Sequence, residues 1–445
     1  MLVRVLYRGY LLGRRVTAWL QRRFTPAGGF VLVGLALTAT ASDPEHTLGW
    51  QAFVVLAAML GMAVLMTPFF RGKFAVQRHG PRFATAGEPF SLRIRVANLS
   101  GRPQRGLEYL EDLREADVSL AEFRARLQPG RRTRSFRLSG PLPPVRRAQT
   151  RAEPLPPMPA GSHAEVRIDV LPHRRGPLVL AGGLIGRPDP LGLLRSFCRA
   201  PLPQTVLVLP RRFPLAPPPM PGQSQYQRGG VALAAGVGES EEFVALRDYR
   251  RGDSLRRVHW RTTARLGRPI VKEYQDEHFI RHALVLDTFC EAADDARFEE
   301  AVAVAASFAC TVPDQDSLLD LLFVGPHTVC VTTGRGVGHE QQMLEVLAAV
   351  KPCRESKLEA LRSLVMQHHE ALSGCVLVFL DWDEPRRQVV RQLRMLRVPT
   401  LVMVIVPPRT AETFDRGPAG DQPDRLLVLE SGRVGEGLQQ LGDRR

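Results

Sequence analysis

Two long runs of uncharged residues stand near the start of the chain. They are residues 28–41 (GGFVLVGLALTATA) and residues 48–70 (LGWQAFVVLAAMLGMAVLMTPFF), which flank a short polar connection. At 1.5 Å of rise per residue, a helix over the second run crosses a hydrocarbon layer of about 30 Å, whereas the first run is marginal unless residues 24–27 extend it. This pattern predicts two transmembrane helices that form a hairpin.

The charges around these runs predict an orientation. Residues 1–23 carry six arginines, residues 71–73 carry two further basic side chains, and the connection contains Asp43 and Glu45. Under the positive-inside rule both ends of the hairpin face the cytoplasm, so we expect a multi-pass protein of the inner (plasma) membrane with the bulk of the chain cytoplasmic. Residues 1–73 thus form a basic cytoplasmic N-terminus followed by two transmembrane helices.

Two other interpretations of this segment stay open. Residues 39–41 (Ala-Thr-Ala) have the small-x-small form of a signal-peptide cleavage site, although the basic region before them is unusually long for a signal peptide. The two runs also have the composition of buried core helices. The flanking charges and the interfacial position of Trp50 argue against that second alternative.

Strict alternation of apolar and polar residues begins after Lys73. In FSLRIRVANLSGR (90–102), Leu92, Ile94 and Val96 share one face, and the segment ends in an Asn-to-Gly turn. Similar short runs, separated by Gly and Pro, recur up to residue 210. This pattern of short alternating segments predicts an antiparallel, β-sandwich-like domain over 74–210.

The period changes again in the C-terminal half. A Pro/Gly-rich linker (211–240) and a basic segment (241–280) precede alternating apolar strands and amphipathic helices over 281–410. Such alternation predicts a doubly wound, mainly parallel α/β sheet. The remaining residues, 411–445, form a tail with one possible last strand and helix. The predicted fold class is therefore α/β plus all-β, behind a transmembrane hairpin.

The distribution of charge and the cysteine content bear on the binding partners and on the cellular compartment. The net charge is +15, but residues 281–445 carry 18 basic and 24 acidic side chains, so the excess of positive charge is confined to the first 280 residues. Only four of the 60 basic residues are lysines, so an arginine-rich background accounts for part of the high pI. The six cysteines show no metal-ligand spacing, which is typical of a reducing compartment.

The densest basic stretch is 247–272, where nine basic residues surround two aromatic ones. Its glycines predict a tight turn at Gly252 and a helix end at Gly267, and Asp253 or Ser254 is expected to cap a short helix that includes Trp260. Arginine–carboxylate pairs with Trp260 packed beneath them would form a structural knot, whereas surplus arginines would form a docking surface. The candidate residues for either role are Phe243, Arg247, Asp248, Tyr249, Gly252, Asp253, Arg256, Arg257, Trp260, Arg261, Arg265 and Glu273.

The order of these parts resembles the bacterial DUF58 family. The most specific pattern consists of Phe243, Arg247, Tyr249, Gly252, Asp253, Arg257, Trp260, Ala264, Arg265 and Glu273, and a weaker signature consists of Asp189, Pro190, Gly192 and Leu193. The resemblance implies a von Willebrand factor A-like α/β domain and a MoxR-type AAA+ ATPase as partner. It supplies an architecture and a partner class rather than a reaction.

One departure from the von Willebrand factor A pattern concerns metal binding. Metal-binding domains of that type carry Asp-x-Ser-x-Ser after the first strand, whereas this chain reads Asp-Thr-Phe-Cys-Glu at 287–291. A divalent cation would need an improvised set of oxygen ligands from Asp287, Glu291, Asp381 and Asp383. We expect solvated acids at strand ends instead, and therefore no metal.

Three functional hypotheses follow. The first is a membrane-anchored, non-enzymatic adaptor that binds a cytosolic protein partner and needs no cofactor or small-molecule substrate; the chain has no P-loop motif and no identifiable nucleophile with a base. The second is binding of nucleic acid or an anionic surface by the arginine-rich 247–272 stretch. The third is a metal-dependent enzyme at the α/β strand ends.

Overall fold

The computed structural model describes most of the chain. Its described residues are 2–41, 47–67, 70, 72–114, 120, 123–124, 127–129, 136–138, 147–215, 242–250, 252–275, 280–290, 296–311, 317–333, 339–353, 358–411, 414–416 and 426–443. The chain divides into two compact units, Met1–Arg211 and Arg212–Arg445. Each unit is described by itself below.

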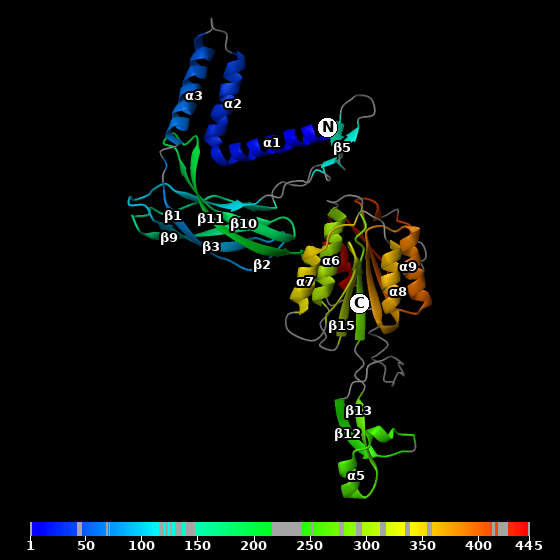
Figure 1. Cartoon of the computed structure of the whole chain (residues 1–445). Coiled ribbons are helices and arrows are strands. Elements are labelled where there is room, and N and C mark those ends of the chain that lie inside the picture. Colours follow the sequence, from blue (N-terminus) through cyan, green and yellow to red (C-terminus); the bar gives the residue numbers. More distant parts are fainter. Residues whose placement is uncertain are drawn as a thin grey trace. The chain divides into compact units, whose positions relative to one another are not determined.

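Three helices open the first unit (Figure 1). They are α1 (Leu2–Arg23), α2 (Pro26–Ala41) and α3 (Thr47–Met66), of which α2 and α3 pack against each other. The Thr25 hydroxyl accepts a hydrogen bond from the Gly28 N–H (3.0 Å) and so caps α2, which explains why residues 24 and 25 do not lengthen this helix.

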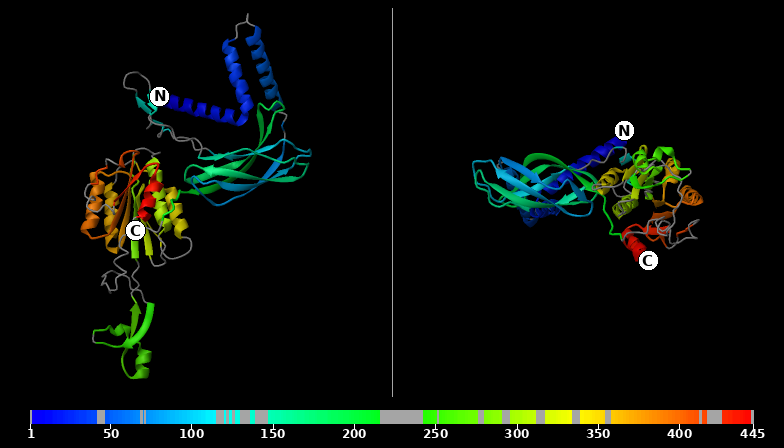
Figure 2. Two further views of the ribbon diagram at one scale, coloured as in Figure 1. Left: turned by 180° about the vertical axis from the view of Figure 1, so that it is seen from behind. Right: turned by 90° about the horizontal axis from the view of Figure 1, so that it is seen from below.

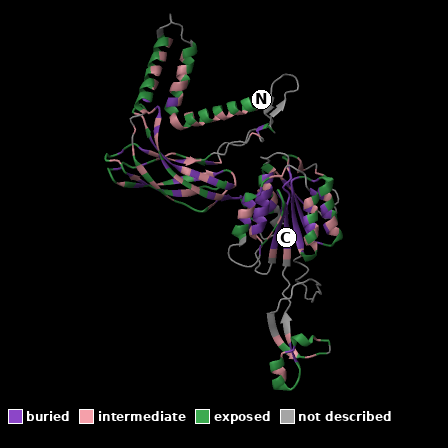
Figure 3. Ribbon diagram, in the orientation of Figure 1, coloured by how far each residue is buried: buried purple, intermediate pink, exposed green. Residues whose placement is uncertain are grey.

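Only one of the two predicted transmembrane helices is long enough to cross a membrane. Residues Leu48–Met66 of α3 are long and apolar enough to cross a membrane, whereas α2 has 16 residues, about 24 Å of helix. Both helices leave large apolar side chains exposed, with Phe30 and Leu48 each at least 80% accessible (Figure 3). Core helices would bury these side chains, so the structure argues against the core-helix interpretation.

Two facing sheets form the rest of the first unit. The four-stranded sheet has the order β1-β3-β9-β7 and the five-stranded sheet the order β2-β11-β10-β4-β8. The strands are β1 (Phe74–His79), β2 (Phe83–Thr85), β3 (Phe90–Asn98), β4 (Glu108–Leu113), β7 (Ala148–Thr150), β8 (Glu153–Pro154), β9 (His163–Pro172), β10 (Gly176–Pro188) and β11 (Arg195–Leu209). A small separate hairpin pairs β5 (Leu127–Pro129) with β6 (Phe136–Leu138).

The alternation seen in the sequence places the core between these sheets. Leu92, Ile94 and Val96 of β3 are buried, and they share one cluster with Ile168 of β9 and Ile185 of β10. The pairing is antiparallel throughout except that β2 runs parallel to β11, which the alternation pattern did not predict.

The turn between β10 and β11 anchors the helices to the sandwich. The Asp189 carboxylate accepts hydrogen bonds from the N–H groups of Leu193 (3.1 Å) and Leu194 (2.8 Å). The carbonyl groups that this turn presents accept hydrogen bonds from the backbone N–H and the hydroxyl of Thr25, just before α2. A Cβ on Gly28 would lie 2.1 Å from the Leu193 carbonyl oxygen, so the close approach requires glycine there.

The end of the hairpin is held at the same place. The Ser196 hydroxyl donates to the Thr67 carbonyl (3.0 Å), directly after α3, and Ala63 of α3 packs with Leu193, Leu194 and Phe24 in a small apolar cluster. The Asp189–Leu193 signature is therefore structural in this chain, because it fixes both ends of the α2–α3 hairpin to one turn of the sandwich.

The second unit contains a six-stranded sheet with the order β16-β15-β14-β17-β18-β19. Its strands are β14 (Ile280–Leu286), β15 (Ser317–Val324), β16 (Thr328–Thr333), β17 (Gly374–Phe379), β18 (Thr400–Val406) and β19 (Leu426–Glu430). Its helices are α6 (Ala296–Thr311), α7 (His339–Ala349), α8 (Leu358–His368), α9 (Glu384–Met395) and α10 (Val434–Asp443), with a short 3-10 turn, η4 (His369–Ala371).

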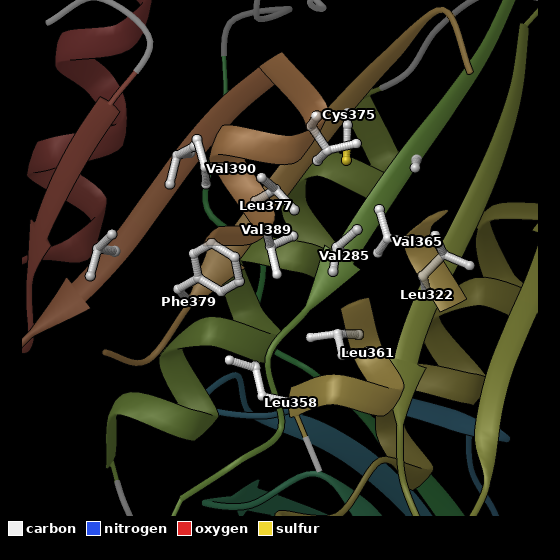
Figure 4. Close-up of a cluster of buried hydrophobic side chains, with 14 of the residues drawn as sticks. Val285, Leu322, Leu358, Leu361, Val365, Cys375, Leu377, Phe379, Val389 and Val390 are labelled. Carbon is white, nitrogen blue, oxygen red and sulfur yellow. The ribbon is translucent and has the colours of Figure 1, made fainter. Parts of the chain in front are cut away.

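Helices cover both faces of this sheet (Figures 1 and 2). Every strand pair is parallel except β15–β16, so the mainly parallel sheet predicted from the sequence is present. On one face, Leu361 of α8 and Val389 of α9 pack onto Val285, Leu377 and Phe379 of the central strands (Figure 4). The possible strand and helix of the C-terminal tail are β19 and α10, and β19 completes the sheet.

We expect the Asp189 turn to be needed for hairpin docking. Asp189→Ala removes two charge-assisted hydrogen bonds and should cost about 1 to 3 kcal/mol locally. Hydrogen exchange of the full chain in detergent should then be faster in peptides covering 189–198 and 24–34. Asp169→Ala is the control, because Asp169 is an exposed carboxylate on β9. Unchanged exchange in Asp189→Ala would show that the turn does not hold the hairpin.

Candidate functional site

The basic segment 242–275 forms a β-hairpin with a helical insertion. Strand β12 (Glu242–Asp248) pairs antiparallel with β13 (Ile270–Gln275), and between them lie η3 (Leu255–Arg257) and α5 (Trp260–Leu266). The extended segment, the turn, the short helix and the second strand thus follow the order expected from the sequence. Val258, Ile270 and Val271 are its buried apolar residues among those described.

One arginine–carboxylate pair fixes the turn of this hairpin. The Arg247 guanidinium donates two hydrogen bonds to the Asp253 carboxylate (2.7 and 2.8 Å), which also accepts the backbone N–H of Arg250 (2.8 Å). These bonds, with Arg247 first, lower the pKa of Asp253 to about 2. Gly252 lies between them with φ +110°, a conformation that favours glycine. The arginine–carboxylate pair expected of a knot is present here, and we call Arg247, Gly252 and Asp253 the knot.

The cap of α5 differs from the expectation. His259, not Asp253 or Ser254, caps the helix: its Nδ1 atom lies 2.6 Å from the Thr262 hydroxyl and accepts the Thr262 N–H. Asp253 is engaged with Arg247, and the Ser254 side chain makes no capping bond to η3. The helix ends at Gly267 (φ +67°), as the sequence predicts.

Trp260 does not pack beneath the arginines. Its side chain is 67% exposed, because the seven-residue α5 buries no residue and turns its half-buried threonines, Thr262 and Thr263, toward the hairpin. Trp260, Arg261 and Arg265 lie on the opposite side of the helix, all exposed, and we call these three residues the α5 surface. Among the described residues, Arg261 and Arg265 belong to no ion pair.

The other candidates divide between the knot and its surroundings. Arg268 pairs with Asp248 (3.1 Å) at an exposed position, Tyr249 is half-buried, and Arg256 and Arg257 are exposed on η3. Phe243 and Glu273 lie on β12 and β13, opposite Tyr274 and Ala245. The structure therefore brings Arg247, Gly252 and Asp253 together and leaves most of the remaining basic residues at the surface.

The acids at the α/β strand ends differ in exposure: Asp381 and Asp383 are exposed, as expected, but Asp287 is not. Asp287, after β14, is fully buried; its carboxylate accepts the Nε–H of Arg386 (2.7 Å) and the backbone N–H groups of Phe289 (3.0 Å) and Leu380 (3.1 Å). Asp383 caps α9 and accepts a second hydrogen bond from Arg386 (2.7 Å). The expectation of solvated acids is wrong for Asp287, because a guanidinium neutralises it.

These contacts leave a poor set of metal ligands. Asp381 accepts its neighbour's N–H, from Trp382 (2.8 Å), and Glu291 lies outside the described residues. Among the described residues, no group of three or more His, Cys, Asp or Glu side chains is placed to hold a metal ion. The cation that Asp287 meets at this edge of the sheet is Arg386.

A second buried ion pair, which the sequence analysis did not predict, lies in the sandwich. Arg78 of β1 contacts Glu111 of β4, both with fully buried side chains, and the Tyr109 hydroxyl donates to the same carboxylate (2.9 Å). Burial raises the pKa of Glu111 to about 7, and Arg78 partly opposes this shift. Strands β1 and β4 belong to different sheets, so only the packing of the two sheets brings these residues together.

A comparison with known protein families matches the part of the chain that contains most of the basic segment 242–275 and most of the six-stranded sheet. Residues 245–419 match the family described as "Protein of unknown function DUF58". The chain contains a DUF58 region. Its DUF58 region begins within β12 and extends past β18, so it includes the Arg247–Asp253 knot, the α5 surface and the Asp287–Arg386 pair.

Two further proteins are similar to parts of the chain. The "Uncharacterized protein YeaD" of Bacillus subtilis is 27% identical over 164 residues, which span 36% of this chain and 39% of that protein. A crystal structure of a GH20 exo-β-N-acetylglucosaminidase from Vibrio harveyi aligns over 75% of this chain and 57% of its own with 9% identity. Its TM-score is 0.14, too low to indicate a shared fold.

Loss of Arg386 should destabilise the α/β domain. Arg386→Ala leaves the buried Asp287 carboxylate without its charge partner, at a cost of about 3 to 5 kcal/mol. Arg391→Ala, which removes an exposed ion pair with Glu384 on the same helix, should cost about 1 kcal/mol or less. Denaturant unfolding of the full chain measures both. Equal effects of the two substitutions would show that the Asp287–Arg386 pair is dispensable.

The hairpin knot should resist mild acid. Because the pKa of Asp253 is lowered to about 2, its contribution to stability is complete above the ordinary pKa near 3.8 and is lost only as the pH falls through about 2. Hydrogen exchange in 247–258, corrected for intrinsic rates, should therefore give the same protection at pH 7 and pH 4.5. Asp253→Asn should lower protection at both values. Wild-type protection that falls to the variant's level at pH 4.5 would contradict the lowered pKa.

Proposed function

We propose that this DUF58 protein is a membrane-anchored, non-enzymatic adaptor whose α5 surface docks an acidic protein partner. The observation that carries the proposal is the exposure of Trp260 beside Arg261 and Arg265, which belong to no ion pair among the described residues. Tryptophan and arginine are the residues most enriched at interface hot spots. Leaving an indole in water has no stability benefit, so a binding role accounts for its position.

The knot supports this proposal because it makes the surface rigid. Arg247, Asp253 and the Arg250 backbone hold the turn, while the Thr263 hydroxyl accepts the Ile270 N–H (3.0 Å) and ties α5 to β13. A side chain presented from a fixed scaffold loses less conformational entropy on binding than one on a free loop. The structural and docking roles of the segment therefore belong to different residues of one hairpin.

The partner class rests on the DUF58 resemblance and on charge. A MoxR-type AAA+ ATPase, or its client, is the partner that the resemblance implies, and an acidic patch on it would complement Arg261 and Arg265. In this proposal the adaptor performs no chemistry and the ATPase supplies the energy. When the strands of the six-stranded sheet are numbered in chain order, they lie across the sheet in the order 3-2-1-4-5-6. This order supports a von Willebrand factor A-like domain in which Arg386 takes the place of a metal.

The anchor in this proposal is the α2–α3 hairpin, placed in the inner (plasma) membrane with both ends in the cytoplasm. The length of α3 and the exposed apolar side chains of both helices support it. A helix as short as α2 is accommodated when the bilayer thins locally. The arginines of 1–23 then lie on the cytoplasmic side, as the positive-inside rule requires.

Nucleic-acid binding is the second candidate, and the exposure of Trp260 favours it too. An accessible indole next to arginines is the arrangement on which unpaired bases stack. The two candidates differ in salt dependence: oligonucleotide affinity that falls steeply with salt, and is lost in Trp260→Ala, would support this second function.

The test compares crosslinked partners in native membranes. Trp260→Ala combined with Arg261→Glu should abolish recovery of an AAA+ ATPase by the full chain, as judged by mass spectrometry. Arg433→Glu is the matched control, because it reverses an exposed charge in the same unit but outside the hairpin. Recovery of the ATPase with all three proteins would overturn docking at the α5 surface, and recovery with none of them would overturn the partner assignment.

A further inference from the structure

The first helix, α1, has two different long faces. At about 100° per residue, Val3, Tyr7, Tyr10, Leu11 and Ala18 fall on one side, and all five are half-buried. Tyr7 and Tyr10 pack against Phe123 with tilted rings, whose centroids lie 5.5 and 5.4 Å from that of Phe123. This side of α1 is therefore already occupied by the chain itself.

The opposite side carries an apolar stripe that nothing in the described structure covers. Val5, Leu12, Val16 and Trp19 lie within an arc of about 60°, and their side chains are 59%, 66%, 48% and 55% exposed. Four large apolar side chains in one row over four turns form a patch that water solvates poorly. The stripe is therefore the part of α1 at which we expect a binding partner.

A row of arginines runs beside this stripe. Arg4, Arg8 and Arg15 lie within an arc of about 40° that adjoins the apolar stripe, and all three are exposed. The first turn of α1 carries no acidic residue, and the last turn carries Arg22 and Arg23. An apolar row flanked by arginines is the pattern of a helix that lies in a membrane interface, whereas this many arginines excludes α1 as a transmembrane helix.

The end of α1 is fixed at the base of the proposed anchor. Arg22 pairs with Asp112 (2.8 Å), Phe24 bridges to Leu194, and Thr25 begins the docking contacts of α2. In Figure 1, α1 runs from this point across the direction of the α2–α3 hairpin, and Figure 3 shows its exposed side. In the proposed orientation this turn lies at the cytoplasmic ends of the hairpin, so the C-terminal end of α1 lies at the depth of the lipid headgroups.

We propose that α1 lies in the cytoplasmic interface of the bilayer, with its apolar stripe among the upper acyl chains and its arginine row on anionic phospholipid headgroups. This inference rests on the proposed membrane anchoring. Trp19 occupies the depth that tryptophan favours in membranes, and each arginine near an anionic surface adds about 1 kcal/mol of attraction. The helix would hold the sandwich close to the membrane and limit its tilt.

Lipid fits this surface better than a protein does. Only two residues separate the end of α1 from the start of α2, so a bilayer that contains α2 and α3 reaches α1 without any further association. The adjoining arginines complement the anionic leaflet of the cytoplasmic side. A second copy of the chain would have to cover the stripe with an equally basic helix, which like-charge repulsion opposes.

Tryptophan quenching tests the proposal on the full chain in lipid nanodiscs. The lipids are phosphatidylcholine alone or an equal mixture with phosphatidylglycerol, brominated either near the headgroup end or near the methyl end of the acyl chains. Comparing wild type with Trp19→Phe and Trp50→Phe isolates the emission of each tryptophan. Because Trp19 is exposed, its replacement leaves the fold intact. Trp50, on α3, reports membrane insertion of the hairpin independently of α1.

We expect Trp19 to be quenched by the shallow bromines, more strongly in the anionic mixture, and protected from aqueous iodide. Arg4→Glu with Arg8→Glu should reduce this quenching at least two-fold and leave Trp50 unchanged. Arg93→Glu with Arg105→Glu, a matched change on the sandwich surface, should leave both unchanged. Quenching of Trp50 without Trp19 would overturn the interfacial helix alone. Quenching of neither would overturn the membrane anchor and the inference with it.

Discussion

The arrangement of the first unit depends on one turn, in which the Asp189 carboxylate closes the β10–β11 connection. Because its two hydrogen bonds hold the Leu193 and Leu194 N–H groups, the neighbouring carbonyl groups point outward and bind Thr25 at the start of α2. The same turn packs against α3 through Ala63. The hairpin of uncharged helices and the sandwich are thereby joined through short contacts. Because α1 ends at the same place, these contacts also fix its C-terminal end.

Two arginine–carboxylate pairs in the second unit have different structural roles. Arg386 is buried against Asp287 and Asp383, where it replaces solvent and any cation at the carboxyl end of the central strands. Arg247 is part-exposed against Asp253, where it fixes a turn. In both cases the pairing engages the carboxylates. Within the basic segment, Arg247 is thus paired internally, whereas Arg261 and Arg265 on α5 are exposed.

The sequence predicted strands of two kinds, those with one buried face and those buried on both faces. Alternation identified β3, because one face packs in the sandwich and the other meets solvent, and apolar runs identified β14, β17 and β18, which are buried on both faces. It did not predict the edge strand β16, whose six residues follow β15 after a short turn and run antiparallel to it. An edge strand packs on one side only, so its pattern is weak.

The site was predictable only where it depends on neighbours in sequence. Arg247, Gly252 and Asp253 lie within seven residues, and their turn chemistry is local, so the knot was foreseen. Asp287 and Arg386 are 99 positions apart, and only the β14–β17 pairing brings them together. The prediction that Trp260 packs beneath the arginines was wrong for a different reason. Tryptophan is usually packed, but a seven-residue helix on a two-stranded hairpin offers no core to pack into. The exposed indole is therefore the feature that propensity could not predict and that a partner best explains.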